Sequence, residues 1–434
     1  MGPLPQLSRR QWRELVWVVL GYGAAALGAL AGTALLARLL SPASYGVLAL
    51  GLALAAVPHQ TLFGPLATAC LRFYPVAAER AQRGALLTAF WQLTLAALGL
   101  AAAMAAVAMA LLPAVAPELP RLLIAAALLF ALPFGVAGLL DAFQTAARER
   151  AIASRHQALS QWLRYPVAAL IVWAVGEDGT LALIGQGGGV ALALVWQSYD
   201  FHRLIRSPAW DEPAAGPAVV TWRRDLLGYG WPVAAWGLVT GTHLMSDRWA
   251  LVWFTDLDTV GRYAVLYQIG YLPVVLAFAV LQRFVAPLLF ARAGGGESEE
   301  RLAAAVGASN RLVLGGLAVT ALGAILAALI HRPLFQLLFG PAYEGVSALL
   351  PWMVLWCGLF ECGQLQSLGF MSRLSTRTLL PIKLGTAGLG IALNLAGAWV
   401  AGLEGLIAGG TLTALLYFGW LVWKSRRRVA GAAL

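Results

Sequence analysis

The sequence has few of the residues from which soluble enzymes build their sites. Only 12% of its 434 residues are charged, five are histidine and three are cysteine. Cys70, Cys357 and Cys362 all fall inside long apolar runs, so we expect them to act as small apolar side chains. Their spacing matches no zinc or redox motif.

Sequence signatures of catalysis are also absent. The sequence contains no phosphate-cradling glycine loop, no nucleophile elbow and no paired loop carboxylates. Gly187-Gly188-Gly189 lies in an apolar run without a following Lys-Ser/Thr pair, which favours close helix packing over a nucleotide site. No loop exceeds about 25 residues, too short for a soluble domain. We therefore expect a protein that is not an enzyme and that works through membrane helices.

What the sequence does have is apolar length. It is 60% hydrophobic, and about twenty mostly apolar residues cross a hydrocarbon core. We place twelve such segments at residues 14–37, 45–70, 84–112, 121–143, 157–176, 180–202, 226–251, 260–290, 305–330, 345–371, 378–400 and 403–423. Because twelve is even, both chain ends are expected on one side of the membrane.

Lysine and arginine gather in alternate gaps between these segments. When residues near a segment end are counted with the nearer side, 23 of the 30 basic residues lie on one side and 5 on the other, while Arg164 and Arg283 lie deeper within segments. Short loops rich in Lys and Arg stay on the cytoplasmic side, so the split predicts cytoplasmic N- and C-termini. The same rule accounts for the formal charge of +10. We therefore expect membrane lipids, and no nucleic acid, as partners of the basic surface.

The two halves of the sequence contain similar short motifs at corresponding positions. Leu20-Gly21-Tyr22-Gly23 opens the first segment and Leu227-Gly228-Tyr229-Gly230 opens the seventh, while Arg38 corresponds in position to Arg248. Six spans separate the halves, so the repeats run the same way and are related by an axis along the membrane normal. The alternative is chance recurrence in a chain rich in Gly and Leu.

The repeat predicts an all-α, polytopic membrane protein of about twelve transmembrane helices. We expect an N-terminal six-helix bundle at 1–202, a cytoplasmic linker at 203–224 and a C-terminal six-helix bundle at 225–434. A central cavity is expected between the two bundles.

Ionisable residues inside apolar segments are the first functional candidates. An Arg at a helix centre costs about 2.5–3.5 kcal/mol on insertion scales, so it usually faces a cavity or a partner. We expect Arg164 and Arg283 to project into a cavity, whereas Arg72 lies near a boundary and can reach the interface.

Two acidic residues are candidates for ion coupling. Asp247 shares a helix face with Thr240 and His243 and precedes Arg248, so it is either a proton or ion switch or half of an ion pair that pins the helix end. Glu361 lies near the middle of the tenth segment, where it either takes up a proton or links helices by hydrogen bonds.

Tyr263, Tyr267 and Tyr271 repeat at every fourth position and predict an aromatic ridge. Such a ridge can stack on sugar rings. The alternative is helix packing together with the aromatic belt at the membrane interface.

Several short motifs resemble those of a transporter superfamily. Leu35-Leu-Ala-Arg-Leu-Leu-Ser-Pro-Ala-Ser-Tyr-Gly46 resembles the signature after the first helix of polysaccharide exporters and O-antigen flippases of the multidrug/oligosaccharidyl-lipid/polysaccharide (MOP) superfamily. Pro232, Asp247-Arg248 and Val260-Gly261-Arg262-Tyr263 are similar to the counterpart of this signature in the second half of those proteins. Leu338-Phe-Gly-Pro-Ala-Tyr343, before the tenth segment, also resembles a motif of those proteins.

The resemblance implies two six-helix bundles, alternating access, and a polyprenyl-pyrophosphate-linked oligosaccharide carried across a bacterial inner membrane for O-antigen lipopolysaccharide or exopolysaccharide synthesis. It implies no cofactor, a proton or sodium gradient as the driving force, and glycan polymerase or assembly proteins as partners. Arg38, Asp247 and Arg248 match motif positions. The substrate-binding candidates are Arg38, Arg164, Arg248, Arg283 and Tyr267, and the ion-coupling candidates are Asp247 and Glu361.

Two other functions fit the composition. A cation-coupled drug or metabolite antiporter of the same superfamily would favour acidic residues deep in the N-terminal half, and the first three segments hold none away from their ends. A membrane glycan polymerase or transferase would usually bring a large outer loop with catalytic carboxylates or arginines, which the short loops here do not provide.

Overall fold

The computed structural model describes residues 9–115, 117, 119–206, 216–293, 299–372 and 376–431. Within these ranges the chain is helical and contains no β-strand. The helices form two compact units, Met1–Gly241 and Thr242–Leu434, whose boundary lies inside α8 (Gly216–Phe254). Each unit is described by itself.

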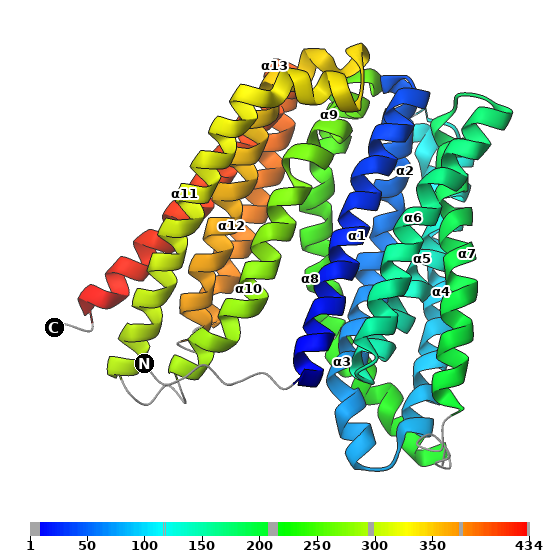
Figure 1. Cartoon of the computed structure of the whole chain (residues 1–434), viewed down its shortest axis with the longest axis vertical. Helices are drawn as coiled ribbons and strands as arrows, with labels where there is room; N and C mark the ends of the chain where they lie inside the picture. Colours follow the sequence, from blue (N-terminus) through cyan, green and yellow to red (C-terminus); the bar gives the residue numbers. More distant parts are fainter. Residues whose placement is uncertain are drawn as a thin grey trace. The chain divides into compact units, whose positions relative to one another are not determined.

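The N-terminal unit is built from long helices that pack side by side (Figure 1). They are α1 (Arg9–Leu39), α2 (Pro42–Pro58), η1 (His59–Phe63), α3 (Gly64–Glu79), α4 (Arg83–Val115), α5 (Leu122–Ala146), α6 (Arg150–Val175), α7 (Gly179–Ile205) and the first part of α8. Helix α6 packs between α1 and α7, and α5 contacts α2, α3 and α7. The core is apolar and includes the fully buried rings of Phe63, Phe90 and Phe143.

Polar side chains fix where two of these helices begin. Ser41 caps α2, accepting a hydrogen bond from the Ser44 backbone N–H, and Pro42 follows as the first helical residue. Asp178 caps α7 by accepting from the backbone N–H groups of Thr180 and Leu181. The Ser41 backbone N–H donates to Glu177 at 2.6 Å, so the start of α2 is tied to the loop before α7.

The second predicted segment contains a local interruption of its α-helix. Residues His59–Phe63 form a short π-helix between α2 and α3, with Pro58 just before it and Pro65 just after. A proline removes one backbone donor and crowds the preceding turn, which favours local rewinding of the helix. The segment therefore forms one rod with a defect near its middle.

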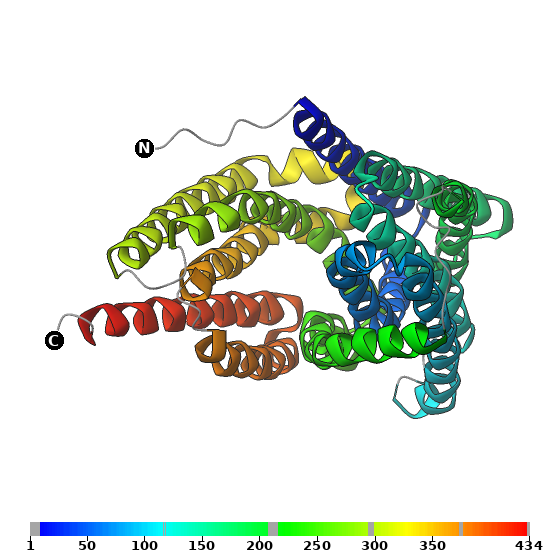
Figure 2. The ribbon, with the colours of Figure 1, turned by 90° about the horizontal axis from the view of Figure 1, so that it is seen from below.

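The C-terminal unit is arranged around α12. Its elements are the last part of α8, α9 (Leu257–Gly270), α10 (Leu272–Ala293), α11 (Glu299–Leu338), the 3₁₀ helix η3 (Pro341–Leu349), α12 (Leu350–Ser372) and α13 (Thr376–Gly431). Helix α12 contacts α9, α10, α11 and α13, and Figure 2 shows it between the ribbons of α11 and α13.

Helix α13 consists of two rods joined by a sharp bend. Ala401 and Gly402 leave helical geometry, and Gly402 takes a φ of 56°, which a residue without a Cβ adopts easily. This break lies in the gap predicted between the segments 378–400 and 403–423.

Every predicted apolar segment falls on helical structure to within one residue at each end. Nine helical stretches in the described ranges are long and apolar enough to cross a membrane. The predicted linker at 203–224 is shortened by both neighbouring helices, since α7 continues to Ile205 and α8 begins at Gly216. The sequence-based domain limits stay a prediction.

Candidate functional site

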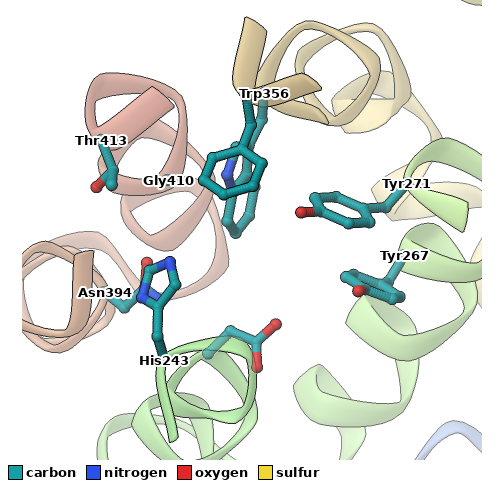
Figure 3. A pocket seen from close by; sticks show the side chains of 9 residues that line it. His243, Tyr267, Tyr271, Trp356, Asn394, Gly410 and Thr413 are labelled. Atoms are coloured by element: carbon teal, nitrogen blue, oxygen red, sulfur yellow. The ribbon is translucent and has the colours of Figure 1, made fainter. Parts of the chain in front are cut away.

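A small cavity of about 20 Å³, with room for about one water molecule, lies within the C-terminal unit. It is lined by His243, Asp247, Tyr267, Tyr271, Trp356, Phe360, Asn394, Gly410 and Thr413. These residues come from α8, from α9 and the Tyr271 position just after it, from α12, and from both rods of α13 (Figure 3).

Asp247 and Arg248 form an ion pair at one edge of the cavity. Arg248 Nη1 lies 3.1 and 3.2 Å from the two carboxylate oxygens of Asp247, and the Tyr263 hydroxyl donates to the same carboxylate. The Arg248 backbone N–H donates to it as well, at 2.7 Å. Asp247 is 4% exposed, so the pair is largely withdrawn from solvent. The ion pair lies within α8, about two turns before this helix ends at Phe254.

The predicted tyrosine ridge forms and joins this pair to the cavity. The Arg248 guanidinium lies over the Tyr267 ring, 4.7 Å from its centroid, and the Tyr271 ring stacks on Tyr267 at 4.6 Å and 12°. Tyr271 in turn meets Trp356 edge to face at 5.9 Å. Tyr263 is fully buried, so the ridge both packs the helix and supplies one aromatic wall.

The opposite wall is polar and has unused hydrogen-bonding capacity. The Asn394 side-chain nitrogen donates to the Ser246 hydroxyl at 2.9 Å, while its oxygen is buried without a partner. The His243 Nδ1 atom is also buried without a partner. Figure 3 shows His243, Asn394 and Thr413 on one side of the cavity and Tyr267 and Tyr271 on the other.

Two glycines, which have no side chain, provide the space that the rings of His243 and Trp356 occupy. A Cβ at Gly390 would collide with the imidazole of His243, and a Cβ at Gly410 would collide with the indole of Trp356. Close packing against bare backbone fixes the orientation of both rings. The walls of the cavity are therefore preformed.

Glu361 lies one residue beyond the cavity-lining Phe360 on α12. It is 8% exposed, and Gln282 of α10 donates a hydrogen bond to its carboxyl at 2.9 Å. The structure thus brings Asp247, Arg248, Tyr267 and Glu361 into one region, and it links Glu361 to a neighbouring helix.

Arg164 belongs to the N-terminal unit and is held by uncharged partners. Its Nε and Nη2 atoms donate to the Gln186 side-chain oxygen at 3.0 and 2.6 Å. Its guanidinium lies over the rings of Phe130 and Tyr165, at 5.2 and 4.8 Å. Among the described residues no carboxylate is within ion-pair distance of it. Arg164 therefore keeps its full positive charge inside a membrane-spanning helix.

Two other predicted site residues are placed less fully. Arg38 is exposed and lies in the last turn of α1. The contact between α1 and Tyr165 is made at Gly32, more than one helical turn earlier. Arg283 lies on α10, but its side chain is outside the described part of the structure.

Sequence reasoning missed two polar contacts in the N-terminal unit. His156 Nε2 and Asp200 Oδ2 lie 2.9 Å apart between α6 and α7, and Gln186 supports Arg164. Each pair spans more than twenty residues, so no helical spacing indicates it. Within the described ranges, no group of three or more His, Cys, Asp or Glu side chains is placed to hold a metal ion.

The fold has counterparts among solved structures. The lipid II flippase MurJ, in an inward closed conformation, superposes with a TM-score of 0.65 at 11% identity, covering 95% of this chain and 87% of that one. A point mutant of the Vibrio cholerae MATE transporter VcmN gives 0.62 at 14% identity, with 98% and 97% covered. An inward-facing multidrug resistance MATE transporter of the MOP superfamily gives 0.60 at 14% identity, with 98% and 96% covered.

No protein-family model and no curated protein matches the sequence. The structural likenesses show that the chain has the fold of MOP-superfamily transporters, as the sequence resemblance predicts. With its long apolar helices, this makes it a multi-pass membrane protein.

Proposed function

We propose that this protein is a flippase that moves a polyprenyl-pyrophosphate-linked oligosaccharide from the inner to the outer leaflet of a bacterial inner membrane by alternating access. The glycan serves the synthesis of a surface polysaccharide such as O-antigen or exopolysaccharide, next to glycan polymerase or assembly proteins. Both chain ends lie in the cytoplasm. A proton or sodium gradient drives transport, and no cofactor takes part.

The observation that carries the proposal is the charge of Arg164. Arg164 is partly buried in its helix. A cation inside a membrane helix is costly, and it usually faces a cavity or a partner. The neutral Gln186 fixes the guanidinium without cancelling its charge. A planar guanidinium matches phosphate oxygens with paired donors, so Arg164 is suited to an anionic pyrophosphate head group.

The acidic residues support the same choice of substrate. In α1, in the rod from α2 to α3, and in α4, the acidic positions are Glu14 and Glu79, close to helix ends. These first helices, without mid-helix carboxylates, are poorly suited to hold an organic cation. The likeness to the lipid II flippase MurJ agrees with a lipid-linked substrate.

The test is mass spectrometry of polyprenyl-linked lipids in a strain that lacks the protein. We expect pyrophosphate-linked oligosaccharide to accumulate and surface glycan to fall, with both restored by the wild-type gene and not by Arg164→Gln. Arg164→Lys, which keeps the charge but loses the planar fork, is the matched control and restores export in part. Unchanged lipids and glycan in a strain without a second flippase would reject the proposal.

A cation-coupled drug antiporter is the second candidate. The MATE likenesses and the buried carboxyls of Asp247 and Glu361 favour it. The same deletion strain distinguishes the two functions, because an antiporter predicts sensitivity to cationic drugs with normal lipid-linked intermediates.

A further inference from the structure

We infer that the first turns of α8 bind an anionic phospholipid of the surrounding membrane. In this site Arg223 and Arg224 contact the phosphate of the head group, and Leu227 and Trp231 contact the acyl chains. All four residues belong to the N-terminal unit. The inference assigns a lipid partner to one defined part of the basic surface, and it does not depend on which substrate the protein transports.

The first turns of α8 are held on the connection between α3 and α4. Figure 1 shows them beside the lower ends of these two helices. Trp222 is 1% exposed, and its indole N–H donates to the Gln82 side-chain oxygen at 3.1 Å. The Arg80 guanidinium lies 5.7 Å from the centre of the Trp222 ring, and Phe73 meets that ring edge to face at 6.0 Å. These contacts fix the rotation of α8 about its axis and so decide which face points outward.

The outward face of α8 combines apolar and basic side chains. It carries four exposed residues at positions i, i+4, i+7 and i+11, namely Val220, Arg224, Leu227 and Trp231. Trp231 is 73% exposed and Leu227 is 55% exposed. Arg223 is exposed as well and lies beside this stripe. A helix surface that is both apolar and basic is typical of segments at the boundary of a membrane.

The order of these residues along α8 matches the layers of a membrane leaflet. The apolar segment predicted from the sequence begins at residue 226, so Arg223 and Arg224 lie at its boundary and Leu227 and Trp231 lie inside it. Arginine at such a boundary reaches the head groups, and tryptophan is enriched at the interface. A phospholipid carries its phosphate next to its acyl chains and fits this order. A soluble anion would leave the apolar residues without a partner.

The two arginines are available to a ligand. Neither side chain makes a hydrogen bond or an ion pair with any other residue that the structure describes. Asp225 is the one carboxylate between residues 216 and 231, and it lies about 100° around the helix from Arg224, on the side away from Arg223. The two guanidinium groups therefore keep their charge, and each offers paired N–H donors to phosphate oxygens.

The experiment measures lipid binding at this site and nowhere else. The full-length Val220→Cys variant is labelled with bimane and reconstituted in phosphatidylcholine vesicles, where Cys70, Cys357 and Cys362 are buried and do not compete for the label. Quenching by phosphatidylglycerol with brominated acyl chains is compared with quenching by brominated phosphatidylcholine. We expect a preference of about thirtyfold for phosphatidylglycerol, because each of two arginines near an anionic lipid contributes about 1 kcal/mol.

Variants in the same labelled background assign the preference to the arginines. Arg224→Gln should lower it to about fivefold, and the double variant Arg223→Gln/Arg224→Gln should abolish it. Arg224→Lys keeps the charge and should keep most of the preference. It also provides the test if the double variant does not fold.

Two controls separate this site from general attraction between a basic protein and anionic lipid. The double variant Arg121→Gln/Arg332→Gln removes two exposed arginines elsewhere and should leave the preference unchanged. A bimane label at Leu192→Cys, midway along α7 where the side chain is 57% exposed, should report no preference for phosphatidylglycerol.

Four results would overturn the inference. They are equal quenching by the two brominated lipids, an equal loss in the Arg121→Gln/Arg332→Gln control, the same preference at Leu192→Cys, and displacement of phosphatidylglycerol by millimolar inorganic phosphate, which would make the site a general anion site. Displacement by an equimolar amount of polyprenyl pyrophosphate would also overturn it, because the site would then belong to the transport substrate. None of these results bears on the accumulation of lipid-linked oligosaccharide that tests the flippase.

Discussion

The guanidinium of Arg164 is held by Gln186, a neutral side chain that is 1% exposed, through two hydrogen bonds of 3.0 and 2.6 Å. A carboxylate at this position would bind the arginine more strongly and cancel its charge. The glutamine instead holds the cation in one orientation and leaves it positive. This arrangement suggests that the charge itself is used.

The charge can be cancelled without touching the arginine. We expect Gln186→Glu to form an ion pair with Arg164 and to lower glycan export at least tenfold, with normal amounts of protein in the membrane. Quantified surface glycan and immunoblotting measure both effects. Export at the wild-type level would show that Arg164 needs only its packing and not its charge.

The pair of Asp247 and Arg248 is expected to matter for stability. Asp247→Asn removes the charge that pairs with the largely buried Arg248 guanidinium, and breaking a buried ion pair typically costs about 3–5 kcal/mol. The variant should therefore unfold at a clearly lower temperature in a thermal melt of the purified protein.

The control for that melt is a second Asp-Arg pair in the same unit. Asp258 accepts from Arg262 at 2.6 Å but is 42% exposed, so Asp258→Asn should change stability by less than about 1 kcal/mol. Equal melting shifts in the two variants would contradict the structural role given to Asp247.

Glu361 is the acidic residue to which we assign ion coupling, because Asp247 is already neutralised by Arg248. Glu361→Gln keeps the size of the side chain and can keep a hydrogen bond to Gln282. We expect this variant to lose the dependence of transport on the proton gradient. Transport measured with and without an uncoupler tests this, and an unchanged dependence would make Glu361 a structural link between α10 and α12.

The contact between Glu177 and Ser41 predicts a dependence of stability on pH. Hydrogen bonds from the Ser41 hydroxyl and backbone N–H lower the pKa of Glu177 from its ordinary value of 4.5. A lowered pKa means that the carboxylate stabilises the fold above the ordinary pKa, and that this contribution disappears as the pH falls through the lowered value. Glu177→Gln should therefore melt slightly earlier than wild type at neutral pH. In acid below the lowered pKa the two should melt alike, and a constant difference would refute the assignment.

The helices could be predicted from the sequence because apolar length and basic loops act along the chain. The gap between residues 400 and 403, for example, contains the bend at Ala401 and Gly402. The π-helix at His59–Phe63 could not be predicted, because the prolines around it also occur in regular membrane helices.

The candidate site could be predicted only in part. The spacing of the tyrosines predicts the aromatic ridge, and the neighbouring positions of Asp247 and Arg248 predict an ion pair as one of two alternatives. The contact of Asp247 with Tyr263 and the approach of Asn394 to His243 depend on how separate helices pack together. The periodicity of a single helix gives no information about such packing. Gln186 escaped notice because a glutamine carries no charge and lies in a stretch rich in glycine.

The most direct test of the account is transport by the purified protein in proteoliposomes that contain polyprenyl-pyrophosphate-linked oligosaccharide. A glycosidase that cannot cross the membrane reports how much glycan has reached the opposite leaflet. We predict that wild-type protein increases this fraction, and that Arg164→Gln does not. Glycan that stays in its original leaflet, while the same liposomes move ethidium, would contradict the account.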